Sequence, residues 1–509
     1  MRNKLVLVAA ALAWAPCFSA EVSLRIRADE PGPEISRYLY GQFMEHLGRD
    51  IYGGIWVGPD SAIPNRDGLR TDVLDALTDL QIPVIRWPGG CYADEYHWQN
   101  GIGPRDERPV TINLSWGGVE ESNAFGTHEF FALTEAIGAD AYIAGNLGTG
   151  SAQEMVDWLE YLTSPTNSTL AQQRRANGRD APYRVPFFGV GNESWGCGGQ
   201  MRPEYYVDLY KQAAEFLRVP GQRLFRIASG GYDARTDWTE ALSRIAENID
   251  GISHHYYTTP TGVWAAKGSA TEFGEDQWIS TLARALRVDD HISAQEAVLA
   301  RNDPNGRIGI YLDEWGTWYD ETPGTSALWQ QNTLRDAIVA ALHFHVFHRH
   351  AERLRMANIA QAINVLQAMI LTDDDAIVLT PTYHVFRMYI PFQGATYLPV
   401  TAEASPTYSL GDYSVPAVSA TAARGQDGRL YASIASLDPD EEVDITLLIE
   451  GAAPRNVSAE ILTAPAMNAH NTFDAPDTVQ PEAFGDIRID SGSLQLTLPA
   501  KSIVMIAMD

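Results

Sequence analysis

The stretch RVPFFGVGNE (residues 184–193) decides the fold hypothesis, because its apolar run ends in a carboxylate. Val185–Val190 has the length and composition of a buried strand, and Asn192 and Glu193 follow at its carboxyl end. A glutamate in this place is either a capping acid in a turn or a catalytic acid. A catalytic acid would need a partner carboxylate at the end of another strand.

Further apolar runs of strand length precede residue 390, and segments with helical periodicity separate most of them. Repeated β–α units of this kind predict an α/β fold, a (β/α)8 TIM barrel with loop insertions. The predicted strands are 38–46, 82–90, 141–147, 184–193, 223–231, 251–257, 307–315 and 362–369, and the predicted helices are 72–80, 128–138, 152–162, 205–217, 238–249 and 334–350.

The N-terminus has the layout of a secretory signal peptide. Arg2 and Lys4 precede an apolar run that is too short to span a bilayer, and the small residues Ser19 and Ala20 follow. We therefore expect cleavage near Ala20 and export to the periplasm or the extracellular medium. No later apolar run is long and uncharged enough to cross a membrane.

Helical periodicity stops near residue 390, and strand-like segments such as EEVDITLLIEG (441–451) alternate with turn residues from there on. This alternation of strand-like segments and turn residues predicts a C-terminal antiparallel β-sandwich, jelly-roll-like in architecture. The segment EVSLRIRAD (21–29) also alternates, and we expect it to add a strand to that sandwich. The predicted organisation is a signal peptide (1–20), an N-terminal strand that joins the sandwich (21–35), a catalytic barrel (36–390) and the β-sandwich domain (391–509).

Charge and cysteine content exclude several partners. The net charge of −28 makes nucleic acid and anionic membranes unlikely binding partners, since both are polyanions. Cleavage of the signal peptide would remove Cys17 and leave Cys91 and Cys197, either as two buried thiols or as a pair.

Polar side chains cluster where the predicted barrel strands end, which is where such barrels place their active sites. Glu193 ends strand four and Glu314 ends strand seven, so the two carboxylates can face each other across the barrel mouth. Facing carboxylates beside amides and aromatic rings are typical of glycosidic bond cleavage. Trp116 and Trp318 are either sugar platforms or core aromatics.

The tract HFHVFHRH (343–350) resembles a metal site at first sight. It lies within a predicted helix on the barrel exterior and contains no carboxylate ligand. We therefore predict no metal site and no cofactor.

At these residues the chain resembles the family 51 glycoside hydrolases, which are α-L-arabinofuranosidases. The resemblance rests on GQFMEHLGRDIYGGIW (41–56), VIRWPGGCYADEYHWQNGIGPRDERP (84–109), NAFGTHEFF (123–131), NLGTG (146–150), VGNESWGCGGQMRPEYY (190–206), YLDEWGTWY (311–319) and MANIAQAINVLQAMILTD (356–373), which follow one another across the whole barrel.

The resemblance implies a retaining mechanism with Glu193 as general acid/base and Glu314 as nucleophile. The resemblance also implies that the substrates are arabinose-containing polysaccharides or oligosaccharides and that the protein forms a homo-oligomer such as a hexamer. The implied substrate contacts are Glu45, Cys91, Asn192, His255, Tyr257, Gln367, Trp116 and Trp318, with Arg86 supporting the nucleophile.

The sequence is compatible with three functions. The favoured one is an exo-acting arabinofuranosidase acting on arabinoxylan, arabinan or their oligosaccharides. An endo-acting glucanase or xylanase has the same barrel, and an inactive sugar-binding protein would lack one of the two carboxylates. Because Cys91 and Cys197 both lie at the predicted barrel mouth, we also expect them to be neighbours, with a disulfide as one outcome.

Overall fold

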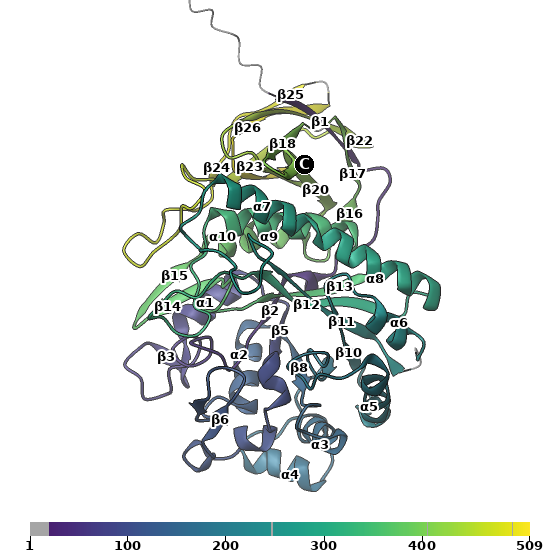
Figure 1. The fold of residues 1–509 in the computed structure, drawn as a ribbon, viewed down its shortest axis with the longest axis vertical. Helices are drawn as coiled ribbons and strands as arrows, with labels where there is room; N and C mark the ends of the chain where they lie inside the picture. Colours follow the sequence, from purple (N-terminus) through teal and green to yellow (C-terminus); the bar gives the residue numbers. More distant parts are fainter. Residues whose placement is uncertain (1–19, 246–247, 405, 491) are drawn as a thin grey trace, which may run out of the picture.

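The computed structural model describes residues 20–509 except 246–247, 405 and 491, and its larger part is a closed barrel of parallel strands. The strands follow one another around the barrel in chain order, and a sheet-rich C-terminal part packs against one side of the barrel (Figure 1). The predicted fold class is confirmed. The barrel strands are β2 (Gly41–Phe43), β5 (Val84–Trp87), β8 (Asp140–Gly145), β9 (Phe187–Val190), β10 (Phe225–Tyr232), β11 (Gly251–Thr258), β12 (Gly309–Thr317) and β13 (Leu354–Ala360).

Side chains from different strands fill the barrel interior, so the barrel is a packed core. Strand β9 is buried along its whole length, which explains its continuous apolar sequence. One buried cluster takes a single residue from each of six strands, and these layered residues hold the barrel closed. Its members are Val84, Tyr142, Phe187, Ile227, Tyr311 and Met356.

The eighth strand is not where the sequence predicted it. Strand β13 is Leu354–Ala360, and it pairs with both β12 and β2. The predicted strand 362–369 is instead a buried loop, in which Asn364 and Leu366 have left-handed backbone angles (φ of 62° and 50°) that no regular strand contains. Its apolar residues pack into the core from an irregular backbone, so apolar content alone was misleading.

Helices cover the outside of the barrel. Five predicted helices are present as α1 (Thr71–Asp79), α2 (Thr127–Ile137), α3 (Ala152–Thr163), α5 (Pro203–Phe216) and α9 (Leu334–Arg349), while α6 (Asp237–Ser243) is shorter than expected. Not predicted were α4 (Thr169–Ala176), α7 (Glu275–Leu286), α8 (Val288–Asn302) and α10 (Pro381–Met388). Across the described part of the chain, no helix has both the length and the apolar character needed to cross a bilayer.

The C-terminal part contains two packed sheets, and the N-terminal strand β1 (Ala20–Arg27) lies within one of them. This strand pairs parallel to β22 and antiparallel to β17. One sheet has the order β17 (Val400–Ala404), β1, β22 (Val443–Glu450), β26 (Ser493–Leu498), β25 (Ile487–Asp490). The other has the order β16 (Thr396–Leu398), β20 (Val418–Arg424), β21 (Leu430–Ser436), β27 (Ile503–Met508), β23 (Val457–Leu462), β24 (Glu482–Ala483).

Small two-stranded sheets lie in the segments that connect the larger elements. They pair β3 (Asn65–Arg66) with β4 (Leu69–Arg70), β6 (Thr111–Asn113) with β7 (Val119–Glu121), β14 (Ile370–Asp373) with β15 (Ala376–Leu379) and β18 (Thr407–Leu410) with β19 (Tyr413–Pro416).

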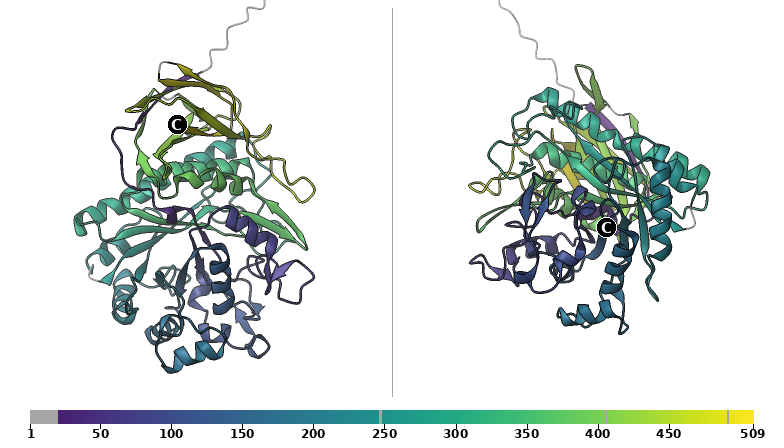
Figure 2. Two further views of the ribbon diagram at one scale, coloured as in Figure 1. Left: turned by 180° about the vertical axis from the view of Figure 1, so that it is seen from behind. Right: turned by 60° about the horizontal axis from the view of Figure 1, so that its bottom comes forward.

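The histidine tract of α9 joins the barrel to the sandwich. Helix α9 lies between the two parts in the views of Figures 1 and 2. His345 bonds to Ser419 Oγ at 2.8 Å, and His348 bonds to Thr421 Oγ1 at 3.0 Å, both on β20. Burial lowers the pKa of His348 to about 3, so this ring is neutral. His345 and His348 therefore pack between the two parts, whereas His343 bonds to the Ala285 carbonyl and His350 to the carboxylates of Asp289 and Glu296.

Candidate active site

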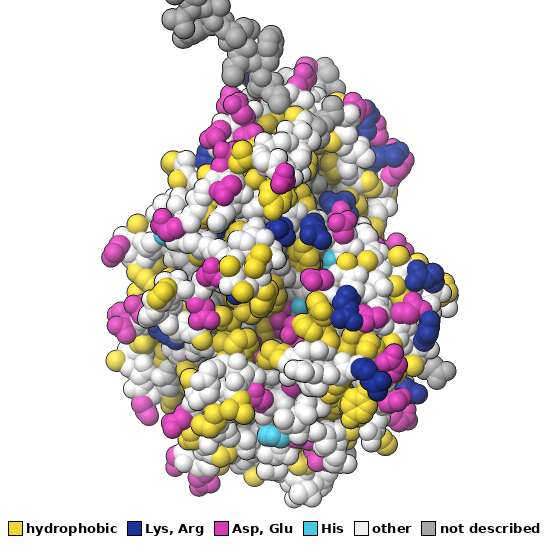
Figure 3. All heavy atoms as spheres, viewed as in Figure 1, with side chains coloured by type: hydrophobic (Ala, Val, Ile, Leu, Met, Phe, Trp, Pro, Cys, Tyr) yellow, Lys and Arg dark blue, Asp and Glu magenta, His cyan; other side chains and the backbone are white. Residues whose placement is uncertain are grey.

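A cavity of about 810 Å³ opens at the carboxyl ends of the barrel strands, and both predicted catalytic glutamates line it. The space-filling view shows this face hollowed, with acidic and histidine side chains inside the hollow (Figure 3). The location is the one that this barrel architecture uses for catalysis.

Glu193 and Glu314 meet in this cavity. Glu193 follows β9 and has a left-handed backbone (φ of 38°), a strained conformation that is concentrated at functional sites. Glu314 lies within β12 and is buried. A carboxylate oxygen of each, together with a ring nitrogen of His255, forms a group whose atoms all lie within 4.8 Å of one another.

His255, on β11, lies between the carboxylates. Its Nδ1 is 2.8 Å from Glu193 Oε1 and 3.3 Å from Glu314 Oε2, and its Nε2 is 3.4 Å from Asp313 Oδ1. Burial lowers the pKa of this imidazole, but the charge of Glu314 and hydrogen bonds to Asp313 and Glu193 outweigh burial and raise the pKa to about 10. The ring is therefore a cation at neutral pH.

Two further donors fix Glu314. Arg86 Nη1 donates to Oε1 at 2.8 Å, and the hydroxyl of Tyr257 donates to Oε2 at 2.8 Å. Arg86 also faces Asp313 Oδ2 at 3.5 Å. Both oxygens of Glu314 thus accept hydrogen bonds from fixed donors, which orient its carboxyl group.

Asp313 is a site residue to which the sequence reasoning gave no role. It accepts hydrogen bonds from Tyr142 at 2.7 Å and from Ser253 at 2.5 Å, and it is fully buried. Burial alone would raise the pKa of Asp313. Arg86 and His255 have a larger effect in the opposite direction and lower this pKa to about 2. Asp313 thus anchors Arg86 and His255, which in turn contact Glu314 and Glu193.

Glu45 lies at the cavity floor beside an amide that the sequence reasoning missed. Its Oε1 accepts from the backbone N–H groups of Gly90 and Tyr92, both at 3.0 Å, and its Oε2 accepts from Gln361 Nε2 at 3.0 Å. Burial and the charge of Glu314 raise the pKa of Glu45 to about 7. Both Glu45 and Gln361 line the cavity.

The predicted contact Gln367 does not face the cavity. Its Oε1 accepts from Thr317 N at 2.9 Å, and its Nε2 donates to the Asp336 carbonyl at 2.8 Å. Both ends of the amide are thus used inside the fold, and Gln361 takes the expected place. Both glutamines follow β13 in the motif of residues 356–373, so only the chain's path after that strand distinguishes them.

Both the side chain and the backbone of Asn192 are fixed by hydrogen bonds. Its Oδ1 accepts from Arg86 Nη2 at 2.5 Å, and its backbone N–H donates to Asp94 Oδ2 at 2.9 Å. Asp94 also accepts from the N–H groups of Leu147 and Gly148, and burial raises its pKa to about 7. Asp94, also missed in the sequence, fixes the loop that carries Asn192 and Glu193.

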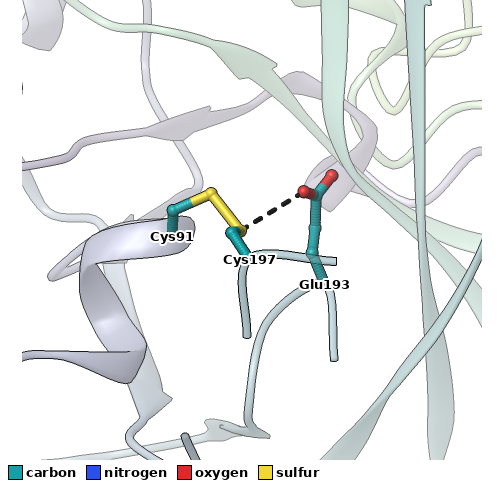
Figure 4. Close-up of side chains that lie close together, drawn as sticks. All are labelled: Cys91, Glu193 and Cys197. Carbon is teal, nitrogen blue, oxygen red and sulfur yellow. Dashed lines mark hydrogen bonds between the residues drawn. A yellow bond between two sulfur atoms is a disulfide. The ribbon is translucent and has the colours of Figure 1, made fainter. Parts of the chain in front are cut away.

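Cys91 and Cys197 form a disulfide beside the acid, with their Cα atoms 5.5 Å apart (Figure 4). The prediction that they are neighbours is confirmed. Cys197 Sγ lies 3.5 Å from Glu193 Oε2. A disulfide sulfur carries no hydrogen, so this contact is a hydrogen bond when Glu193 is protonated and donates to sulfur.

Aromatic side chains form the walls of the cavity. Trp116 and Trp318 line it, as do Trp195 and Trp264, which the sequence reasoning did not single out. The ring of Trp318 packs edge-on to Tyr257, with 4.9 Å between centroids. A pocket with convergent polar groups and aromatic walls is suited to a sugar ring.

Comparison with known proteins gives one consistent picture. Residues 76–275 match the profile of the α-L-arabinofuranosidase 1 domain, and residues 313–502 match that of the α-L-arabinofuranosidase C-terminal domain. A Bacteroides ovatus protein named intracellular exo-α-L-arabinofuranosidase is 48% identical, and the alignment covers 100% of both chains.

Solved structures agree. The crystal structure of the GH51 arabinofuranosidase from Xanthomonas axonopodis pv. citri has a TM-score of 0.95 and 50% identity, covering 96% of this chain and 100% of its own. An arabinose complex of the α-L-arabinofuranosidase from Thermotoga maritima has a TM-score of 0.85 and 30% identity, covering 96% and 99%.

One prediction is contradicted by these comparisons. The sequence suggested a signal peptide and export, but the Bacteroides ovatus relative, which aligns along the whole chain, is named an intracellular enzyme. Residues 1–19, where the signal was predicted, lie outside the described residues.

Proposed function

The chain belongs to family 51 of the glycoside hydrolases, the α-L-arabinofuranosidases, and on that premise we propose that Glu193 and Glu314 release terminal arabinofuranose by double displacement. The comparisons support an exo-acting enzyme and give no support to the endo-acting alternative.

The separation of the two carboxylates carries the mechanistic proposal. Retaining glycosidases hold their carboxyl groups about 5–5.5 Å apart, whereas inverting ones leave about 6.5–9.5 Å for a water molecule. Oxygens of Glu193 and Glu314 lie within 4.8 Å of each other. This spacing supports direct attack by one carboxylate on the anomeric carbon.

The surroundings of each carboxylate support the assignment of roles. The side chain of Glu314 is 7% exposed and held by Arg86 and Tyr257, which suits an oriented nucleophile. That of Glu193 is 19% exposed, so a leaving oxygen or a water molecule can reach it. Its Oε2 lies 3.5 Å from Cys197 Sγ, a sulfur that can accept a hydrogen bond from the protonated acid.

The steps follow from these positions. An oxygen of Glu314 bonds to the anomeric carbon while the glycosidic bond breaks, and the Glu193 proton passes to the leaving oxygen. Cationic His255 then stabilises the carboxylate that Glu193 has become. In the second step water attacks the arabinosyl ester, Glu193 takes up its proton, and Glu314 leaves as a carboxylate.

Glu45 and Gln361 are placed to bind the hydroxyl groups of the arabinose, since both line the cavity floor. The substrates we propose are arabinan, arabinoxylan and their oligosaccharides. The hexamer stays a prediction.

Azide rescue tests the two roles separately. We expect Glu314→Ala and Glu193→Ala to lose about 10³-fold or more in kcat on an arabino-oligosaccharide. With an activated aryl arabinofuranoside, azide should restore turnover in both. The arabinosyl azide should have inverted configuration from Glu314→Ala and retained configuration from Glu193→Ala. Retained product from Glu314→Ala would overturn the assignment.

A further inference from the structure

We propose that Trp264 and Lys267 form a second sugar subsite at the cavity rim, which binds a carboxylate-bearing sugar, a uronic acid, of the glycan that carries the arabinose. The inference rests on the proposed function and adds a substrate class to it. Both residues lie in the loop between β11 and α7.

Trp264 is a large aromatic side chain left open to solvent. The residue is 57% exposed and lines the cavity. Its ring packs on that of Trp318 with 4.8 Å between centroids, and Trp318 in turn packs on Tyr257, the donor to Glu314. These rings therefore run from the nucleophile out to the rim, and the outermost one has a face available for a ligand.

Lys267 adds a positive charge to this aromatic pair. Its Nζ lies 5.1 Å from the Trp264 ring centroid and 5.6 Å from that of Trp318. Among the described residues, no carboxylate is within ion-pairing distance of this ammonium group. In a chain with a net charge of −28, such an unpaired cation beside a sugar-sized aromatic face favours an anionic ligand.

The loop that carries both residues is tied down. The carboxylate of Asp320 accepts from the backbone N–H groups of Lys267 and Gly268, each at 2.9 Å. Thr261 Oγ1 donates to the Ala266 carbonyl at 2.6 Å, and Arg284 Nη2 donates to the Thr261 carbonyl at 3.1 Å. The loop conformation is therefore held without a ligand, and binding would order little chain.

The other charged residues of the cavity leave the selection of the ligand to Lys267. Arg284 and Arg287 line the cavity together with Asp233 and Asp290, so that two positive and two negative charges balance. A neutral sugar could stack on Trp264 but would leave Lys267 unused. A uronic acid offers both a ring face and a carboxylate, which the ammonium can meet with a charge-assisted hydrogen bond.

The test uses two matched oligosaccharides. Each is a xylo-oligosaccharide bearing one arabinofuranosyl unit, one with a glucuronic acid on a neighbouring xylose and the other with that acid chemically reduced to glucose. At low salt the wild type should have a kcat/KM about three to ten times higher for the acidic substrate. In about 0.5 M NaCl that preference should largely disappear.

Substitutions at Lys267 and Trp264 locate the effect. Lys267→Met should bring the ratio of the two kcat/KM values to about one, while Lys211→Met, an exposed lysine on α5, should keep the wild-type ratio. Trp264→Ala should raise KM for both oligosaccharides several-fold, and Trp264→Phe should restore much of the loss. Equal wild-type kcat/KM values for the two substrates, or a preference that survives Lys267→Met, would overturn the subsite. Release of arabinose from neither would overturn the proposed function itself.

Discussion

The ring of His255 is hydrogen-bonded to the carboxylate of Glu193, with 2.8 Å between Nδ1 and Oε1. Asp313 and Glu314 lie close to the same ring, so one cation serves three carboxylates. Removing it would leave buried negative charges facing each other, which is costly in a region of low dielectric.

Because His255 is charged in the folded protein, the protein should become less stable at alkaline pH. Its pKa is about 10 in the folded protein against about 6.5 when unfolded, so its contribution is complete below pH 6.5 and is lost as the pH rises through 10. We expect the difference in Tm between wild type and His255→Asn to be largest near pH 6.5 and to narrow toward pH 10. Thermal unfolding at several pH values checks this, and a constant difference would contradict it.

Glu45 should matter for sugar binding even when its shape is kept. In Glu45→Gln, an NH₂ group would face the donors Gly90 N, Tyr92 N or Gln361 Nε2, and at least one of these hydrogen bonds would be lost. Loss of a hydrogen bond to a charged group costs about 1.5–3 kcal/mol, so kcat/KM should fall about 10- to 100-fold. The control is Glu120→Gln on the exposed strand β7, and equal kinetics for the two variants would refute the role.

The disulfide should support both stability and acid catalysis. It closes a loop of 106 residues, and the double variant Cys91→Ala/Cys197→Ala should lose about 2–4 kcal/mol of unfolding free energy. Because Glu193 would also lose its sulfur acceptor, kcat should fall more for an arabino-oligosaccharide than for an activated aryl arabinofuranoside, whose departure needs no proton.

A dithiol reductant provides the control for this pair. Reduced wild type should approach the stability of the double variant, while the double variant should not respond to reductant. A wild-type Tm that is the same before and after verified reduction would contradict the stabilising role.

The buried histidines of α9 predict sensitivity to acid. His343 and His348 have pKa values of about 3 because of burial, against about 6.5 when unfolded, so stability is lost as the pH falls from about 6.5 toward 3. We expect the Tm of His348→Gln to fall less than that of wild type between pH 6.5 and 4.5. His97→Gln, at a side chain that is 45% exposed, should follow wild type, and a parallel fall in all three would argue against the mechanism.

Much of the barrel and the meeting of Glu193 with Glu314 could be predicted because polar residues follow apolar runs in the sequence. Glu193 follows the buried strand β9, Glu314 lies in the carboxyl-terminal half of β12, and the barrel brings these parts of its strands together. The eighth strand was misplaced because Arg355 and Asn358 interrupt the apolar pattern of β13, while the loop after it has a comparable apolar content.

Support residues were harder to predict. Asp94 works through backbone N–H groups of residues 147, 148 and 192, which no local pattern links to it. Gln361 and Gln367 are six residues apart on one irregular loop, and only the path of the backbone decides which one lines the cavity. Trp264 lies in a connection with no periodicity, so its place on the cavity rim had no sequence signal.

Strand β1 has a consequence for the order in which the protein is made. It leaves the ribosome before the other described strands, yet its neighbours β17 and β22 begin at Val400 and Val443, so β1 must wait for more than three-quarters of the chain before it can pair. At about 5–20 residues per second this is a delay of roughly 20–80 seconds. During that interval the barrel can close, and β1 then completes the sandwich as a late, long-range step.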